Sequence, residues 1–153
     1  MKKSFFFTLF LWTVFPLLVL GQSRKVFHQT FTLDSVKVIY FDVIDSLKVE
    51  PWAGNVALAE TKITILNASK GVVNYLVEED GRYHVDVKTS QDTFSMISRK
   101  RERPAMHTAD GRIMEENVFI RVFVPDNYQM VEPYIWVLPD EEEEEKKEEP
   151  KQN

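Results

Sequence analysis

Cysteine is absent from the 153 residues of this chain. The protein can therefore form no disulfide, use no thiol nucleophile and offer no thiolate to a metal ion. A lipoprotein anchor is excluded as well, because it requires a cysteine at the end of the leader. If the chain is exported, its stability must come from packing and from hydrogen bonds between strands, which favours a bacterial envelope protein over a small disulfide-rich animal module.

Glycine is scarce, with five residues, too few for a glycine-rich phosphate-binding loop. The sequence also has no Gly-x-Ser-x-Gly motif and no EF-hand spacing. Its three histidines, His28, His84 and His107, lie in separate segments without the spacing of metal ligands, so we expect ordinary surface residues. We predict no catalytic residue, no metal ion and no cofactor.

Two pairs of adjacent carboxylates, Glu78-Glu79 and Glu115-Glu116, lie beside expected turns. A general acid needs an apolar environment that raises its pKa, and turns favour solvation instead. The alternative is a small exported hydrolase or carbohydrate-active enzyme in which folding brings distant carboxylates together, for example Asp86 and Glu115.

The first 21 residues have the pattern of an export signal. Lys2 and Lys3 precede an apolar run from Phe5 to Leu20, and small residues end it at Gly21. The run is shorter than the roughly 20 residues that cross a bilayer, so we predict a cleaved signal peptide over 1–21, with a retained membrane anchor as the alternative. The mature protein is expected in the periplasm, on the outer surface or outside the cell, without a transmembrane span.

The acidity of the chain lies at its carboxyl end. The whole sequence has a formal charge of -5, and residues 140–153 alone contribute the same value, with eight acidic residues and three lysines. Such a segment cannot bury apolar area, so we expect a disordered acidic tail. The nearly neutral body, expected to be one domain over 22–139, gives no reason to expect nucleic-acid binding.

The body alternates apolar and polar residues in short runs that turn residues separate. This period of two predicts a mainly β fold, a small antiparallel or solenoid-like domain. Pro51 suggests that the second strand ends there or lies at a sheet edge. The expected strands are 36–41, 46–52, 56–66, 83–87, 118–124 and 134–138.

Residues 69–79 fit two structures. Ser69 could cap a short helix in which Val72, Val73, Leu76 and Val77 form one apolar stripe. Alternatively, Val73 and Val77 belong to a strand that ends at an Asp80-Gly81 turn. We favour the helix, because Gly71 is unfavourable within a strand.

Residues 91–117 are expected to form a hairpin with a long mobile tip that carries four cations: Arg99, Lys100, Arg101 and Arg103. Clustered guanidinium groups bind phosphate or sulfate, so an anionic lipid or glycan is one possible partner. The alternatives are a solvated loop whose charges discourage edge pairing and an intramolecular partner for the acidic tail.

A second candidate surface is apolar. Phe119 and Phe123 flank Arg121 on the face of a strand opposite to its valines, and Trp136 lies in the last strand. These aromatic side chains could form a partner-binding face or pack beneath the long loop.

Three short patterns are typical of modification sites. Ser35 and Ser46 each follow an aspartate and precede an apolar residue, the acceptor pattern for O-glycosylation in some Gram-negative bacteria. Asn67-Ala68-Ser69 has the form of an N-glycosylation sequon, but a helix cap at Ser69 explains it without modification.

The order of the strands resembles the head section of the putative-adhesin family of exported bacterial β-solenoids. The resemblance rests on Leu47-Lys48-Val49-Glu50-Pro51-Trp52, Thr61-Lys62-Ile63-Thr64-Ile65, Gly81-Arg82-Tyr83-His84-Val85-Asp86-Val87 and Val118-Phe119-Ile120-Arg121-Val122-Phe123-Val124-Pro125. Family members continue with Gly- and Asp-rich β-helical coils, whereas this chain has one further strand. The resemblance implies adhesion and no catalytic residues.

The most favoured function is therefore a non-enzymatic envelope or secreted module, adhesin-like, that binds an envelope protein, a glycan or an anionic surface. The missing catalytic motifs and the export signal together point to this class.

Overall fold

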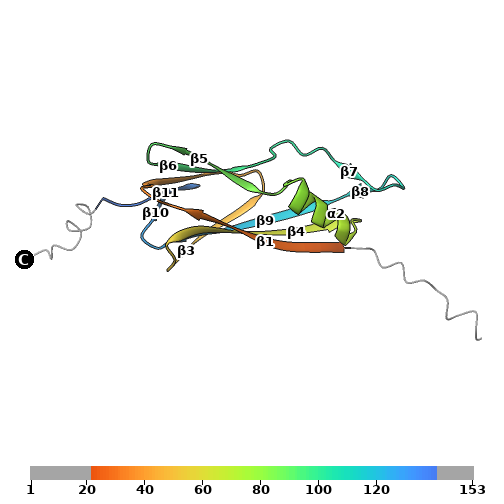
Figure 1. Cartoon of the computed structure of the whole chain (residues 1–153), viewed down its shortest axis with the longest axis horizontal. Helices are drawn as coiled ribbons and strands as arrows, with labels where there is room; N and C mark the ends of the chain where they lie inside the picture. Colours follow the sequence, from red (N-terminus) through yellow and green to blue (C-terminus); the bar gives the residue numbers. More distant parts are fainter. Residues whose placement is uncertain (1–21, 141–153) are drawn as a thin grey trace, which may run out of the picture.

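The computed structural model describes residues 22–140, which form two β-sheets packed face to face, with a short helix at one end (Figure 1). The predicted signal peptide and most of the acidic tail lie outside the described residues. No helix within the described part of the chain is long and apolar enough to span a bilayer.

The first sheet, sheet A, has four strands. Its neighbours pair antiparallel except for the last two, which run parallel. In their order across the sheet they are β1 (Gln22–Thr32), β4 (Val56–Leu66), β9 (Glu116–Pro125) and β3 (Ser46–Trp52).

The second sheet, sheet B, has five strands, of which only β2 and β6 pair in parallel. A separate two-stranded ribbon consists of β7 (Met106–His107) and β8 (Ile113–Met114). Across sheet B the order is β10 (Gln129–Glu132), β11 (Ile135–Val137), β2 (Val38–Asp42), β6 (Thr93–Ser98) and β5 (Val85–Ser90).

The two parallel pairs give the fold its solenoid-like element. The chain crosses from β2 in sheet B to β3 in sheet A, and later from β6 in sheet B to β9 in sheet A. Since β2 pairs with β6 and β3 pairs with β9, the second crossing lies beside the first, as in two neighbouring coils. The prediction of a mainly β fold with one short helix is confirmed.

The core lies between the sheets. Ile120 and Val122 of β9 and Ile39 and Met96 of sheet B are almost completely buried, as the alternation along each strand requires. Each such side chain contributes about 1.5 to 3 kcal/mol when it leaves water. One cluster of buried residues joins both sheets and the helix.

Strand β1 is not among the strands that the sequence pattern predicts. Every second side chain of this strand faces inward, but Lys25 and Gln29 share those positions with Phe27 and Phe31, so the apolar alternation is broken. Polar side chains are tolerated there because they find partners. The Lys25 ammonium contacts the helix, donating to Asn74 at 2.8 Å.

Gln29 links the edge of sheet A to the edge of sheet B. Its side-chain amide donates to the carbonyl oxygen of Val85 and accepts from the Val85 N–H, both at 2.9 Å. The amide thus satisfies backbone groups at the first residue of β5, as a further strand would. The strand β10 was also missed, because it is four residues long and exposed throughout.

The helix predicted over residues 69–79 is confirmed, and the strand alternative is wrong. Ser69 accepts a hydrogen bond from the Val72 N–H at 3.3 Å and so caps α2 (Lys70–Asn74). The helix continues as η2 (Tyr75–Glu79), a π-helical turn in which Leu76 and its neighbour Val77 are buried.

The expected hairpin over residues 91–117 is replaced by three parts. Strand β6 pairs with β5, an extended segment follows, and the β7–β8 ribbon completes the region. The tip of the ribbon is at Thr108–Arg112, with Gly111 at φ +83. The four cations therefore lie before the ribbon and not at its tip.

Candidate functional site

Four cations between β6 and β7 form what we call the basic segment: Arg99, Lys100, Arg101 and Arg103. Each of them contacts a different aspartate, and the aspartates come from four different places in the fold. Arg99 pairs with Asp86 on β5, Lys100 with Asp80 after the helix, Arg101 with Asp42 at the end of β2, and Arg103 with Asp45 before β3.

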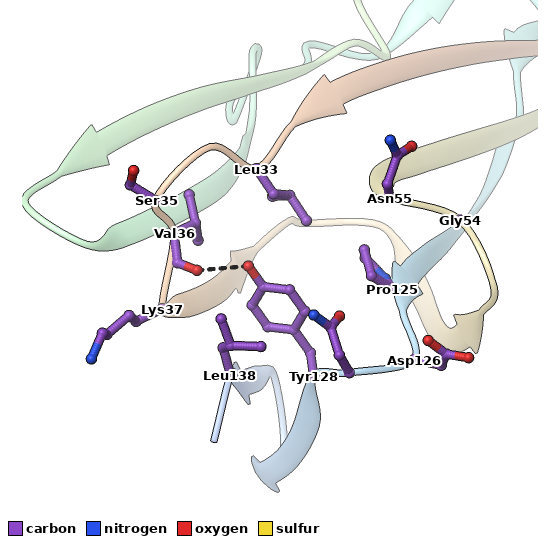
Figure 2. A pocket seen from close by; sticks show the side chains of 11 residues that line it. Leu33, Ser35, Val36, Lys37, Gly54, Asn55, Pro125, Asp126, Tyr128 and Leu138 are labelled. Atoms are coloured by element: carbon purple, nitrogen blue, oxygen red, sulfur yellow. Dashed lines mark hydrogen bonds between the residues drawn. The ribbon is translucent and has the colours of Figure 1, made fainter. Parts of the chain in front are cut away.

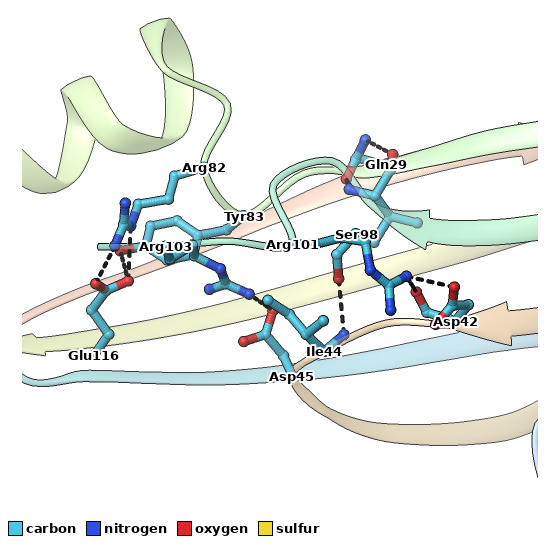
Figure 3. A network of polar contacts seen from close by, with 11 residues as sticks. Gln29, Asp42, Ile44, Asp45, Arg82, Tyr83, Ser98, Arg101, Arg103 and Glu116 are labelled. Atoms are coloured by element: carbon cyan, nitrogen blue, oxygen red, sulfur yellow. Dashed lines mark hydrogen bonds and ion pairs between the residues drawn. The ribbon is translucent and has the colours of Figure 1, made fainter. Parts of the chain in front are cut away.

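The pairs differ in burial. The side chains of Arg101 and Asp42 are 54% and 39% exposed, whereas those of Arg103 and Asp45 are 10% and 13% exposed. An exposed ion pair contributes about 0 to 1 kcal/mol to stability. In a buried pair, loss of one member destabilises the protein much more, because the other charge is left in the interior without a partner. Arg103 also lies over the ring of Tyr83, 5.3 Å from its centroid (Figure 3).

A buried cluster continues the network. Arg82 donates two hydrogen bonds to the carboxylate of Glu116, at 3.0 and 2.7 Å, and the hydroxyl of Tyr83 donates to the same carboxylate at 2.8 Å (Figure 3). Arg82 also donates to the carbonyl oxygen of Pro104 at 2.8 Å, which ties the end of the basic segment to sheet A.

The pKa values in this cluster follow from its contacts. Burial by itself would raise the pKa of Glu116, but the hydrogen bonds from Arg82 and Tyr83 outweigh it and hold the pKa below its usual value. Burial, and next the hydrogen bond to Glu116, raise the pKa of Tyr83. The pair is therefore ionised and the phenol neutral at physiological pH.

Each cation of the basic segment thus forms an ion pair with an aspartate of the same chain. An external phosphate or sulfate would compete with these aspartates, although Arg99, Lys100 and Arg101 stay 38 to 54% exposed. The segment joins sheet A, sheet B and the end of the helix, so its geometry is that of a strap that holds the two sheets together.

The other candidate surface is the outer face of sheet A, which we define by the side chains that point away from sheet B. Phe119, Arg121 and Phe123 lie on it and are partly exposed, alternating with the buried residues of β9. Within residues 22–140, Figure 1 shows no helix or strand beyond sheet A on this side.

A row of charges crosses this face from strand to strand. His28, Glu60, Arg121 and Lys48 lie opposite one another in the strand register. Arg121 lies 3.9 Å from Glu60 and 3.6 Å from Glu50, which also pairs with Lys48. The hydrogen bond from Lys48 lowers the pKa of Glu50, so this carboxylate is ionised at neutral pH.

Beside the charged row lies an open hollow of about 520 Å³, which we call the aromatic groove. Its two rings, Trp52 and Phe123, have centroids 6.0 Å apart and are inclined at 46°. The groove is lined by Glu50, Pro51, Trp52, Leu58 and Phe123.

The ring of Trp52 is fixed in place. Its indole N–H donates to the carbonyl oxygen of Val56 at 3.0 Å. Gly54 lies so close beneath the six-membered ring that a Cβ atom there would overlap it. Trp52 was not selected from the sequence as a site residue, although the period of two places it on the same side of its strand as Lys48 and Glu50.

The aromatic face predicted from the sequence needs one correction. Phe119 and Phe123 do share the outer face of sheet A, but Trp136 lies on β11 in sheet B and is 7% exposed within the core. The reason is register: Trp136 pairs with Ile39, whose side chain points into the core. The tryptophan that lies beside Phe123 on the outer face of sheet A is Trp52.

A second hollow, of about 610 Å³, opens between loops at the end of the sandwich (Figure 2). The hydroxyl of Tyr128 crosses its floor and donates to the carbonyl oxygen of Val36 at 2.7 Å. Lys37, on its rim, pairs with Asp140 at 2.7 Å. The Lys37–Asp140 pair connects the last described residue to the loop between β1 and β2. The hydrogen bond of Tyr128 connects the same loop to the segment between β9 and β10, so this hollow lies where several loops meet.

The candidate modification sites lie at the surface. Ser35 is exposed in a turn with φ 59, and Ser46 is the exposed first residue of β3. Asn67 is engaged: its amide donates to the carbonyl oxygen of Ile113 at 3.0 Å and accepts from Arg112 at 3.2 Å. The Asn67 side chain therefore fixes the β7–β8 ribbon to the end of β4.

The titratable residues considered for catalysis or metal binding come from different elements of the fold. Asp86 accepts three hydrogen bonds from Arg99, and Glu115 is exposed. The ring centroid of His84 lies 4.8 Å from that of Phe27. Burial, and to a smaller extent the positive charge of Arg99, lower the pKa of His84. Within residues 22–140 no group of three His, Asp or Glu side chains gathers as a metal site would require.

Comparisons with family models, with curated proteins and with solved structures find no match to this chain.

Proposed function

We propose that this protein is a non-enzymatic exported module, secreted or held in the cell envelope, that binds its partner through the outer face of sheet A. One observation carries the proposal. The described chain leaves this face open and gives it a preformed aromatic groove, while each cation of the basic segment already pairs with an aspartate of the same chain.

The way in which the carboxylates are used supports binding rather than catalysis. Asp86 is held by Arg99, and Glu116 accepts hydrogen bonds from Arg82 and Tyr83. A catalytic carboxylate pair needs one group that stays protonated at the working pH, and contacts with cations favour ionisation instead.

The relationship to the putative-adhesin family belongs to the proposal. Its support is the crossing from sheet B to sheet A that the chain makes twice in parallel register. The export signal predicted over residues 1–21 would bring such a module to the cell surface, where an open sheet face can meet an envelope protein, a glycan or an anionic surface.

Photo-crosslinking in the cells that produce the protein tests the proposal. Benzoylphenylalanine replaces Phe119 on the outer face of sheet A in one variant of the full chain. In the matched control it replaces Tyr40, an aromatic residue 42% exposed on sheet B. We expect the Phe119 variant, and not the Tyr40 variant, to crosslink envelope or extracellular material. Equal yields at the two positions, or no product at either, would refute the proposal.

A further inference from the structure

The aromatic groove has the properties of a rigid platform. Trp52 is held from one side by Gly54 and at its edge by the hydrogen bond to Val56, and Phe123 borders it. A ligand that stacks on this ring loses little free energy to ordering the protein, because the ring is already in position.

Polar groups border the platform. Glu50 lines the groove and offers carboxylate oxygens, which accept hydrogen bonds. The guanidinium of Arg121 lies over the ring of Phe123, 5.8 Å from its centroid, and its Nη1 is 3.9 Å from Glu60, too long for a hydrogen bond, so its terminal N–H groups can donate to a ligand. Because the two signs of charge compensate each other, the border favours a ligand without net charge.

We infer that the aromatic groove binds a neutral hexose ring of a glycan, an inference that rests on the proposed function and names its ligand. A pyranose combines an apolar C–H face with hydroxyl groups around its edge. The C–H face packs on the ring of Trp52, with Phe123 and Leu58 beside it. Hydroxyl groups donate to the carboxylate of Glu50 and accept from the guanidinium of Arg121.

Other ligands fit less well. A sulfated or uronic glycan would gain little from this row of charges, because Lys48 and Arg121 already lie beside Glu50 and Glu60. An apolar peptide would remove the charges of Glu50, Lys48 and Arg121 from water, which is costly even for paired charges. Both serve as alternative outcomes of the test.

Titration calorimetry on the purified full chain provides the test. The neutral probes are linear hexamers of glucose, mannose and galactose, and the anionic probes are hexagalacturonate and a heparin hexamer. We expect at least one neutral hexamer to bind, and Trp52→Ala to weaken it by about tenfold or more, as loss of a central aromatic contact does. Failure of all three neutral hexamers to bind, or tighter binding of an anionic probe, overturns the inference.

Two further variants separate the groove from a general effect on folding. Glu50→Gln keeps the shape of the groove, removes the ionised acceptor and should weaken binding of the neutral hexamer several-fold. Tyr134→Ala removes an aromatic residue that is 56% exposed away from the groove and should leave binding unchanged. Equal losses in both variants would overturn the inference.

Oxidation of the unmodified protein by N-bromosuccinimide, read by mass spectrometry, gives a result that needs no variant. A saturating neutral hexamer should slow oxidation of Trp52, while Trp136 in the core reacts slowly with or without it. Unchanged oxidation of Trp52 under saturation overturns the assignment. If Phe119 crosslinks an envelope protein and no neutral hexamer binds, the glycan inference fails and the proposed function stands. If Phe119 crosslinks nothing, the proposed function fails.

Discussion

The basic segment and the outer face of sheet A both combine arginine with aromatic rings, yet they use them in opposite ways. In the basic segment, Arg103 lies over Tyr83 and pairs with the nearly buried Asp45. On the outer face, Arg121 lies over the ring of Phe123, 5.8 Å from its centroid, and its carboxylate contacts are longer than hydrogen bonds. Density of charge along a sequence therefore does not reveal which charges form close ion pairs within the fold.

The difference comes from where each residue lies. The basic segment runs past the ends of β2 and the helix, where turns favour aspartates, and also beside Asp86 on β5. On a sheet face, neighbours are fixed by register, so Arg121 meets only the side chains of the adjacent strands. Four predictions would break or sharpen this contrast.

The largest effect is expected at the buried cluster. Glu116→Gln should lower the free energy of unfolding by about 3 kcal/mol, because it leaves the nearly buried guanidinium of Arg82 without a charged partner. Urea unfolding measures it. Glu115→Gln, at the exposed neighbouring residue, is the control and should change little. Equal values for the two variants would mean that the cluster is not a structural support.

Within the basic segment, two substitutions of the same chemistry should differ. Asp45→Asn removes the partner of the nearly buried Arg103 and should cost about 2 kcal/mol. Asp42→Asn removes the partner of the exposed Arg101 and should cost less than about 1 kcal/mol. Chemical denaturation of both variants checks the order, and a larger loss in Asp42→Asn would contradict the burial described for the two pairs.

On the side of the aromatic groove, Gly54→Ala should destabilise the fold by about 1 to 2 kcal/mol, because the added methyl group overlaps the ring of Trp52. Gly71→Ala is the matched control, since its new methyl group meets only ordinary contact in a helix, where alanine is favoured over glycine. Thermal unfolding compares them. A neutral Gly54→Ala would show that Trp52 is not held by the turn.

The smallest effect concerns pH and His84, which lies near Arg99 and Asp86. Its pKa is lowered in the folded protein, so between the ordinary value of 6.5 and the lower folded value the unfolded chain binds more protons. The stabilisation from neutral His84 is present above pH 6.5 and is lost as the pH falls through that range. The slope of unfolding free energy against pH should be smaller in His84→Gln, and an unchanged slope would assign it to other groups.

Much of the fold followed from local pattern. The ranges 46–52 and 56–66 match β3 and β4, and Ser69 caps the helix as its side chain and position predict. Pro51 does lie in an edge strand. The strand β1 escaped prediction because Lys25 and Gln29 face inward with partners from the helix and from β5, contacts that no local pattern contains.

The candidate site was predictable only in part. Phe119 and Phe123 were selected by their period of two, which also fixes the side of the strand on which they lie. Trp52, and not Trp136, lies on the outer face of sheet A because of the sheet that each strand joins. Long-range strand pairing decides this. A period of two gives two faces to every strand, and only packing decides which of them is covered.

The sequence by itself determined the class of the protein: alternation and turn residues commit the chain to strands, and the lack of cysteine leaves packing to hold them. Tertiary structure decided what each charged or aromatic side chain does. Arg103 and Asp45 are 58 residues apart in the chain, and their contact exists because the crossing between the sheets brings β3 to the basic segment. Electrostatic and stacking energies depend on distances in space, which local sequence does not set.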